Sequence, residues 1–200
     1  LYNIKKAEEK LPPKFRWDQR KPRLQQYLSF AKADVIGSQE LQEDQVQGVM
    51  DFLGSSHSYY GIKTRESEGR SDVNAIFYNN ERLELLDSKT VPYNDGRHEN
   101  ALTYCYFYDK IQDTKFVAIN TKLTYGDTER RLLEAQQLND FSNQLPPEEP
   151  IIVLGDFNTF PFVLHDHNIF FDGSHIERIL AGKNLKDAKT ESALGHFGPI

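Results

Sequence analysis

One segment constrains the fold of this 200-residue chain more than any other: residues 151–158 read IIVLGDFN. Four apolar residues that favour β-structure end at Gly155, and the polar residues Asp156 and Asn158 follow at once. This pattern predicts a buried strand that delivers polar groups to the edge of a sheet. In an extended chain, residues two apart share a face, so we expect Asp156 and Asn158 to point together. The alternative is an ordinary Asp/Asn turn after a strand.

Three other segments end in polar groups in a similar way. ADVIGSQEL predicts a short strand that ends in Gln39 and Glu40 before a helix, and FVAINTKLTYGD predicts one that runs into Asn120 and Lys122. Near the start of the chain, YNI places Asn3 within a short apolar strand. Taken alone, a glutamate such as Glu40 is more often a solvated residue at a helix start, because acidic residues favour helix N-termini.

If these strand ends converge at one rim of a sheet, they form an oxygen-rich and mildly acidic site. Magnesium suits such a site, because it is a hard cation held by one or two carboxylates plus waters and substrate phosphate. A zinc site is not indicated, since His165 and His167 are too close in sequence and have no further ligands nearby. We expect these two histidines to lie in a surface loop.

Apolar residues at helical spacing predict helices at residues 22–32 and 44–53. A third helix is predicted at residues 128–143, with a charged start and with Pro146 and Pro147 after its end. Strands are predicted at residues 1–4, 34–38, 74–78, 102–108, 116–121 and 151–154. This order of elements points to sheets that are covered by helices.

Composition limits the class of protein. The length suits one domain, and no apolar run approaches the roughly 18 residues typical of a membrane span. The net charge is -6 and no stripe of Lys or Arg stands out, which argues against a general nucleic-acid binder. Cys105 is the single cysteine, so a disulfide is excluded and a buried free thiol is expected. The chain opens on Leu1, and the compartment stays open.

In order along the chain, the segments YNI, WDQRK, DVIGSQE, NAIFY, NTKL and VLGDFN resemble the successive motifs of the endonuclease/exonuclease/phosphatase superfamily, which includes deoxyribonuclease I. The stretch with Trp17, Arg20 and Lys21 is most similar to a bacterial branch of metal-dependent hydrolases. The resemblance covers essentially the whole chain. It implies an α/β (α+β) fold, a four-layer α/β/β/α sandwich of two packed mixed sheets with the site at one rim.

The resemblance also implies a set of roles. Glu40 would ligate Mg²⁺ or Mn²⁺, and Asn3 would help to orient the metal site. Asp156 would position and activate the attacking water, while Asn158 would bind the scissile phosphate. The implied reaction is hydrolysis of a phosphomonoester or phosphodiester by in-line displacement. The substrate class is a phosphate ester, either a small molecule or a nucleic acid, and no obligate protein partner is evident.

Several positions depart from the family pattern. Lys122 stands where the family usually has histidine, Asp72 where it often has glutamate, and Asn100 where an arginine is common. We expect Lys122 to pair with Asp72 and to act as a fixed cation, with a solvent-exposed lysine as the alternative. Asn120 is expected to contact the substrate, and so is Arg97, which is close to Asn100 in the sequence.

The end of the chain departs from the family as well. Family members carry a late Asp-His pair on a terminal strand, whereas this sequence stops at GHFGPI. We expect His196 to lie in a loop, the C-terminal strands to be missing, and residues 1–200 to form one domain truncated at both ends. The rival hypothesis is a catalytically inactive binding module on the same scaffold.

Overall fold

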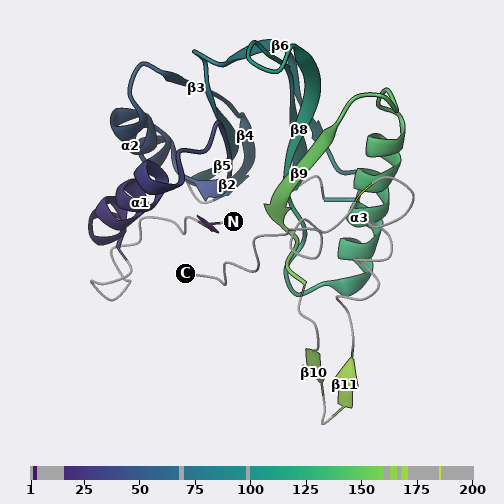
Figure 1. Cartoon of the computed structure of the whole chain (residues 1–200). Helices are drawn as coiled ribbons and strands as arrows, with labels where there is room; N and C mark the ends of the chain where they lie inside the picture. The colour runs from purple at the N-terminus through teal and green to yellow at the C-terminus, as the bar shows by residue number, and fades with distance from the viewer. Residues whose placement is uncertain are drawn as a thin grey trace.

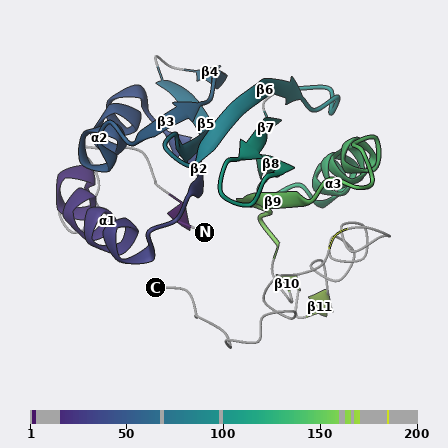
Figure 2. The same ribbon diagram turned by 45° about the horizontal axis from the view of Figure 1, so that its top comes forward.

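The computed structural model describes residues 2–3, 16–67, 70–97, 100–159, 163–165, 168–170 and 185. Two β-sheets face one another, and helices cover their outer faces (Figure 1). A view turned by 45° shows α1 and α2 together on one side and α3 on the other (Figure 2). The predicted four-layer α/β/β/α arrangement is therefore confirmed.

The helices are α1 (Trp17–Ala31), α2 (Glu43–Leu53) and α3 (Thr128–Asn143). The strands are β1 (Tyr2–Asn3), β2 (Val35–Leu41), β3 (His57–Tyr60), β4 (Lys63–Ser67), β5 (Arg70–Asn79), β6 (Leu83–Pro92), β7 (Ala101–Asp109), β8 (Thr114–Lys122), β9 (Ile151–Asp156), β10 (Val163–His165) and β11 (Asn168–Phe170). No helix in the described part of the chain has both the length and the apolar character needed to cross a membrane.

Both large sheets are mixed, as expected. In the first, the order is β1-β2-β5-β3, with β4 also paired to β5, and only the β1–β2 pair is parallel. In the second, the order is β6-β7-β8-β9, and only the β8–β9 pair is parallel. Because β2, β8 and β9 run toward the same rim of the sandwich, their last residues meet there.

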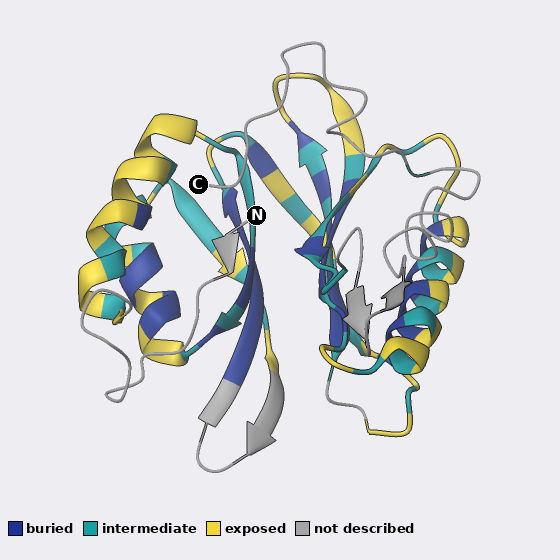
Figure 3. Cartoon of the chain, turned by 90° about the horizontal axis from the view of Figure 1, so that it is seen from below, coloured by how far each residue is buried: buried dark blue, intermediate teal, exposed yellow. Residues whose placement is uncertain are grey.

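Three apolar clusters hold the layers together. The first lies between α1, α2 and the first sheet, and includes Leu24, Val49 and Phe77. The second lies between α3 and the second sheet, and the third lies between the two sheets, around Ile76 and Phe107. Alternate residues of β5 enter different clusters, as the two-residue period of a strand requires. Figure 3 shows the result: the outward faces of α1 and α3 are exposed, and the segments between the layers are buried.

The structure changes several predicted elements. Helix α1 begins at Trp17 rather than residue 22, because Pro22 lies inside the helix and does not mark its start. Strands β3, β4, β6, β10 and β11 were not predicted; β6 mixes exposed and partly buried residues and has no long apolar run. His165, expected in a loop, ends β10 and pairs with Asn168 of β11, and His167 lies outside the described residues.

The single thiol behaves as expected. Cys105 is a free and fully buried cysteine on β7, in the core between the sheets. Burial, with a smaller contribution from the charge of Asp87, raises the pKa of this thiol to about 12. The thiolate form is therefore scarce at neutral pH, and Cys105 is a packing residue rather than a nucleophile.

Candidate active site at the rim of the sandwich

The predicted site residues gather where β2, β8 and β9 end. Asn120 anchors this rim, because its fully buried side chain crosses from the second sheet to the first. Its Nδ2 donates to the carbonyl oxygens of Ser38 (2.8 Å) and Ala75 (3.1 Å), and its Oδ1 accepts from Gln39 Nε2 (2.6 Å). Asn120 was expected to contact substrate. These contacts give it a structural role, and its substrate role stays a prediction.

Glu40 reaches the space between the sheets because β2 is irregular near its end. The pairing of β2 with β5 shifts register between Ser38 and Leu41, and Glu40 has a left-handed φ of 59°. Without this bulge, Gln39 and Glu40 would point to opposite faces. The Glu40 backbone N–H donates to Asn74 Oδ1 (3.3 Å), which supports the bulge from β5. Glu40 thus belongs to the strand end, and the alternative of a solvated helix-start residue is wrong.

Lys122 ends β8 and forms an ion pair with Glu40 that is also a hydrogen bond from Nζ to Oε1. The Lys122 and Glu40 side chains are only 18% and 22% exposed, so neither extends into solvent. The prediction of a Lys122–Asp72 pair is wrong. Asp72 is buried on β5, where its Oδ1 accepts from Gln42 Nε2 (3.0 Å). The bulge in β2 brings Glu40 toward Lys122, and alternation along the strand did not predict this direction.

Asp156 is the register neighbour of Lys122 across the parallel β8–β9 pair. In-register neighbours on adjacent strands share a face, so Asp156 lies on the same side of the second sheet as Lys122. The Asp156 carboxylate accepts the backbone N–H of Asn158 (3.0 Å). Asp156 therefore also shapes the turn that follows β9.

Asn158 lies in that turn and not in an extended strand, since β9 ends at Asp156 and Asn158 has a left-handed φ of 47°. The expectation that the two residues share a strand face is therefore wrong, and the Asp/Asn turn is the observed geometry. The Asn158 Nδ2 donates to the carbonyl oxygen of Leu123 (2.7 Å), and the Leu123 N–H donates to the Asp156 carbonyl (2.9 Å). These bonds tie the loops after β8 and β9 together at the rim.

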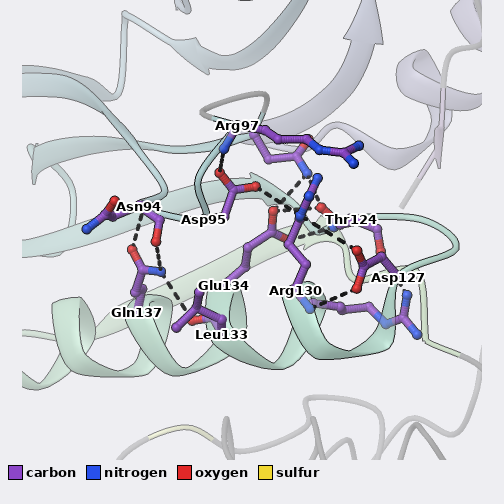
Figure 4. Close-up of polar contacts among 11 residues, drawn as sticks. Asn94, Asp95, Arg97, Thr124, Asp127, Arg130, Leu133, Glu134 and Gln137 are labelled. Atoms are coloured by element: carbon purple, nitrogen blue, oxygen red, sulfur yellow. Dashed lines mark hydrogen bonds and ion pairs between the residues drawn. The ribbon is translucent and has the colours of Figure 1, made fainter.

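A buried carboxylate on α3 fixes the loop after β8. Glu134 accepts the backbone N–H of Thr124 (2.6 Å), the Thr124 hydroxyl (2.7 Å) and Asn100 Nδ2 (3.0 Å) (Figure 4 shows Thr124 and Glu134). Burial raises the pKa of the Glu134 carboxyl above its ordinary value, and these hydrogen bonds oppose that rise. Because Thr124 follows Leu123, Glu134 indirectly holds the carbonyl group that Asn158 binds.

Two predicted site residues have less structural support. Arg97 is exposed in the loop after β6, and its backbone N–H donates to Asp95 Oδ1 (2.9 Å), while Asp95 faces Arg130 of α3 (Figure 4). Its substrate role stays a prediction. The backbone of Asn3 pairs with Gln39, next to Glu40, but the Asn3 side chain and His196 lie outside what the structure describes.

Sequence reasoning missed some contributors to the rim. Asn74, which supports Glu40, and Gln42, which binds Asp72, were not singled out. Asn74 carries a related signal, because it directly precedes the apolar run AIFY, but it lies inside β5 and not at a strand end. Gln42 carries no such signal, because it precedes a helix and forms a capping box with Gln45.

Glu40 is the clearest carboxylate for a metal ion. Within the described residues, no three His, Cys, Asp or Glu side chains group as a metal cage. Magnesium needs only one or two carboxylates plus waters and phosphate. Beside Glu40, the buried Gln39 Oε1 accepts no hydrogen bond from the described residues, and a water or hydrated cation satisfies such an acceptor. The donor set fits one hard cation, and here the Lys122 ammonium occupies the Glu40 carboxylate.

The chain is similar to several known proteins in sequence and fold. Protein angel of Drosophila melanogaster is 27% identical over 180 residues, which cover 84% of this chain and 48% of that protein. The chain thus spans about half the length of this curated relative. The endonuclease/exonuclease/phosphatase from Bacteroides vulgatus superposes with a TM-score of 0.80 at 23% identity, covering 96% of this chain and 73% of that chain. ANGEL2, described as a 2',3'-cyclic phosphatase, has a TM-score of 0.64 at 22% identity, covering 80% and 48%.

At such identities, the likeness to solved structures shows the fold and leaves the activity open. The family model is more specific, because it describes the Endonuclease/Exonuclease/phosphatase family and matches residues 2–192. The chain belongs to the endonuclease/exonuclease/phosphatase family.

Proposed function

We propose that this chain forms the catalytic rim of a metal-dependent phosphoesterase that hydrolyses a phosphomonoester or phosphodiester with an activated water. The observation that carries the proposal is the meeting of Glu40 from the first sheet with Lys122 from the second, beside Asp156. A cation and carboxylates at one rim provide charge for a phosphate and a base for water. ANGEL2, which shares the fold, is described as a 2',3'-cyclic phosphatase, and this supports a phosphate-ester substrate.

The proposed reaction assigns each residue a step. The Asp156 carboxylate accepts a proton as the water oxygen attacks phosphorus, and the ester P–O bond breaks on the opposite side. The Asn158 amide has a second N–H besides the one bound to Leu123, and it donates this hydrogen to a phosphoryl oxygen. A metal ion bound through Glu40 would supply Lewis-acid stabilisation of the phosphate charge.

The first prediction tests the metal ligand. Glu40→Gln removes the charge that attracts a divalent cation. The loss of a charge-assisted contact costs roughly 1.5–3 kcal/mol, so the Mn²⁺ affinity should fall at least about tenfold. Magnesium-stimulated hydrolysis of bis-p-nitrophenyl phosphate and p-nitrophenyl phosphate should fall with it. Isothermal titration calorimetry measures the first effect, and nitrophenol release with Mg²⁺ or with EDTA measures the second.

Glu43→Gln is a matched control. Glu43 lies three residues away at the start of α2, and its carboxylate pairs with Lys63 (3.0 Å) at an exposed position. This variant should keep wild-type metal affinity and turnover. If Glu40→Gln matches Glu43→Gln in both assays, Glu40 is not the metal ligand.

The Lys122–Glu40 pair also favours a second candidate, a binding module without catalysis, because an ammonium neutralises the carboxylate that the reaction requires. Such a module would bind inorganic phosphate or phosphate esters and release no product. Binding without turnover across the substrate panel, at all Mg²⁺ concentrations, would select this candidate over the phosphoesterase.

A further inference from the structure

The Lys122 side chain is mostly buried and does not extend freely into solvent. Its ammonium contacts Glu40 Oε1, and both side chains are about four-fifths buried, at 18% and 22% exposure. The contact joins the ends of β8 and β2, which are 82 residues apart in sequence and belong to different sheets. Partial burial strengthens this ion pair relative to one in open solvent.

Two further carboxylates belong to the same rim. Asp156 flanks Lys122 in register on β9, and the buried Asp72 lies at the start of β5, bound to Gln42 near the end of β2. Of these carboxylates, Glu40 is the one that pairs with Lys122. A divalent cation that approached Glu40 would therefore meet an ammonium already placed on the same oxygen.

We propose that Lys122 is a tethered cation that competes with the divalent metal for Glu40, and that it moves to the phosphate of the substrate when the metal binds. The proposal rests on the proposed function. Tethering raises the local concentration of the ammonium, so a metal must displace it at every encounter. Lysine suits such an exchange, because its compact charge sits on a flexible four-carbon stem and is readily rehydrated or transferred to a phosphate oxygen.

The exchange couples two binding events. A metal ion binds weakly while Lys122 is on Glu40, and an anion that accepts the ammonium removes this competition. By linkage, the anion and the metal then raise each other's affinity by the same factor. The protein would take up its metal mainly together with its substrate.

Mn²⁺ titration of the full-length protein tests the proposal, with free Mn²⁺ measured by electron paramagnetic resonance. Lys122→Gln keeps a polar side chain and removes the competing charge, so its Mn²⁺ affinity should exceed that of the wild type by at least about tenfold. The Glu40→Gln/Lys122→Gln double variant should lose this gain. Lys115→Gln is the matched control, because Lys115 lies on the same strand and rests over the Tyr106 ring, away from Glu40.

Sulfate provides a second arm, as a tetrahedral dianion that leaves Mn²⁺ in solution. It should raise the Mn²⁺ affinity of the wild type several-fold and that of Lys122→Gln much less, since the variant has no ammonium to release. Unchanged or weaker Mn²⁺ binding by Lys122→Gln overturns the proposal, and so does an absence of binding by both proteins. Tighter binding that persists in the double variant also overturns it, because the metal is then not on Glu40.

These outcomes are independent of turnover. Metal-dependent ester hydrolysis without a gain in Mn²⁺ affinity for Lys122→Gln supports the proposed function, and contradicts the competition between Lys122 and the metal. A clear gain in Mn²⁺ affinity for Lys122→Gln with no hydrolysis of any ester supports the competition between Lys122 and the metal, and contradicts the proposed phosphoesterase function.

Discussion

Two residues of the candidate site have unusual backbone geometry. Glu40 and Asn158 have φ angles of 59° and 47°, in a left-handed region that residues other than glycine seldom adopt. At Glu40 the conformation turns the carboxylate toward Lys122, and at Asn158 it turns the amide toward Leu123. Local strain of this kind is common where side-chain direction matters more than strand regularity.

Gly155 illustrates a second constraint at this scale, the close approach of two backbones. A Cβ atom on Gly155 would lie 2.6 Å from the carbonyl oxygen and 2.8 Å from the Cγ2 atom of Thr121 on β8. Because the nearest atom is backbone, the strands must separate to admit it. Gly155→Ala should therefore lower the free energy of unfolding in urea by about 1–3 kcal/mol, the range for overpacked cores.

Gly48→Ala is the control for that prediction. In α2 the nearest atoms to an added Cβ belong to the side chains of Trp17 (3.1 Å) and Lys21 (3.4 Å), which can move. Alanine is also favoured over glycine in a helix by about 0.5–1 kcal/mol. If Gly155→Ala unfolds at the same urea concentration as the wild type, the close backbone approach of β8 and β9 at Gly155 is contradicted.

At the scale of elements, the two sheets are joined at both ends of the sandwich. Asn120 joins them at the rim, and Arg82, in the turn between β5 and β6, joins them at the far end. Arg82 Nη1 donates to Asp34 Oδ2 (2.5 Å) just before β2, while its Nε and Nη2 bind the carboxylate of Asp109 at the end of β7 (3.1 Å and 2.6 Å). These hydrogen bonds, with backbone N–H groups of Ile111 and Gln112, lower the pKa of Asp109 to about 2.

This lowered pKa predicts how stability depends on pH. The stabilisation from Asp109 is present above the ordinary carboxyl pKa of about 4, and it is lost as the pH falls to about 2 and the carboxylate is protonated. Asp109→Asn should lower the free energy of unfolding by about 1.5 kcal/mol at pH 5, a typical value for charge-assisted hydrogen bonds. Urea unfolding at several pH values should show this gap closing toward pH 2. A gap that stays constant from pH 5 to pH 2 contradicts this role of Asp109.

The elements that sequence analysis predicted well are those with strong local signals. Helix α2 and strands β7 and β8 have clear periodicity or long apolar runs, and they lie where expected. Strand β6 was missed because it is an edge strand with many exposed residues. Its pairing with β7 stabilises the extended conformation, which its local sequence alone does not predict.

The meeting of Glu40, Lys122 and Asp156 at one rim was predictable, but the contacts between them were not. Polar groups at strand ends identified Glu40, Lys122 and Asp156, and the fold brings these strand ends to one rim. The partner of Lys122 was not predictable, because it depends on a bulge in β2 that leaves no mark in the alternation of apolar residues. The direction of the Asn158 amide was not predictable either, because it depends on hydrogen bonds to Asp156 and Leu123.

At the scale of the whole molecule, the candidate site exists only when both sheets are packed together. Glu40 and Asn74 come from the first sheet, whereas Asn120, Lys122 and Asp156 come from the second. The Lys122–Glu40 ion pair therefore joins residues of different sheets. The chemistry of the rim is therefore a property of the sandwich, and folding and site assembly are expected to be lost together.

The most direct test of the central claim is the kcat of magnesium-supported phosphate-ester hydrolysis by Asp156→Asn. The exchange keeps the volume of the side chain and an oxygen that accepts the Asn158 N–H, but it removes the base that takes the proton from water. With Asp140→Asn on the surface of α3 as control, the account predicts a kcat about a hundredfold or more below wild type for Asp156→Asn, with an unchanged melting temperature. A kcat of Asp156→Asn within about twofold of wild type is a much smaller loss than that expected for a missing general base. This result would contradict the proposed role of Asp156.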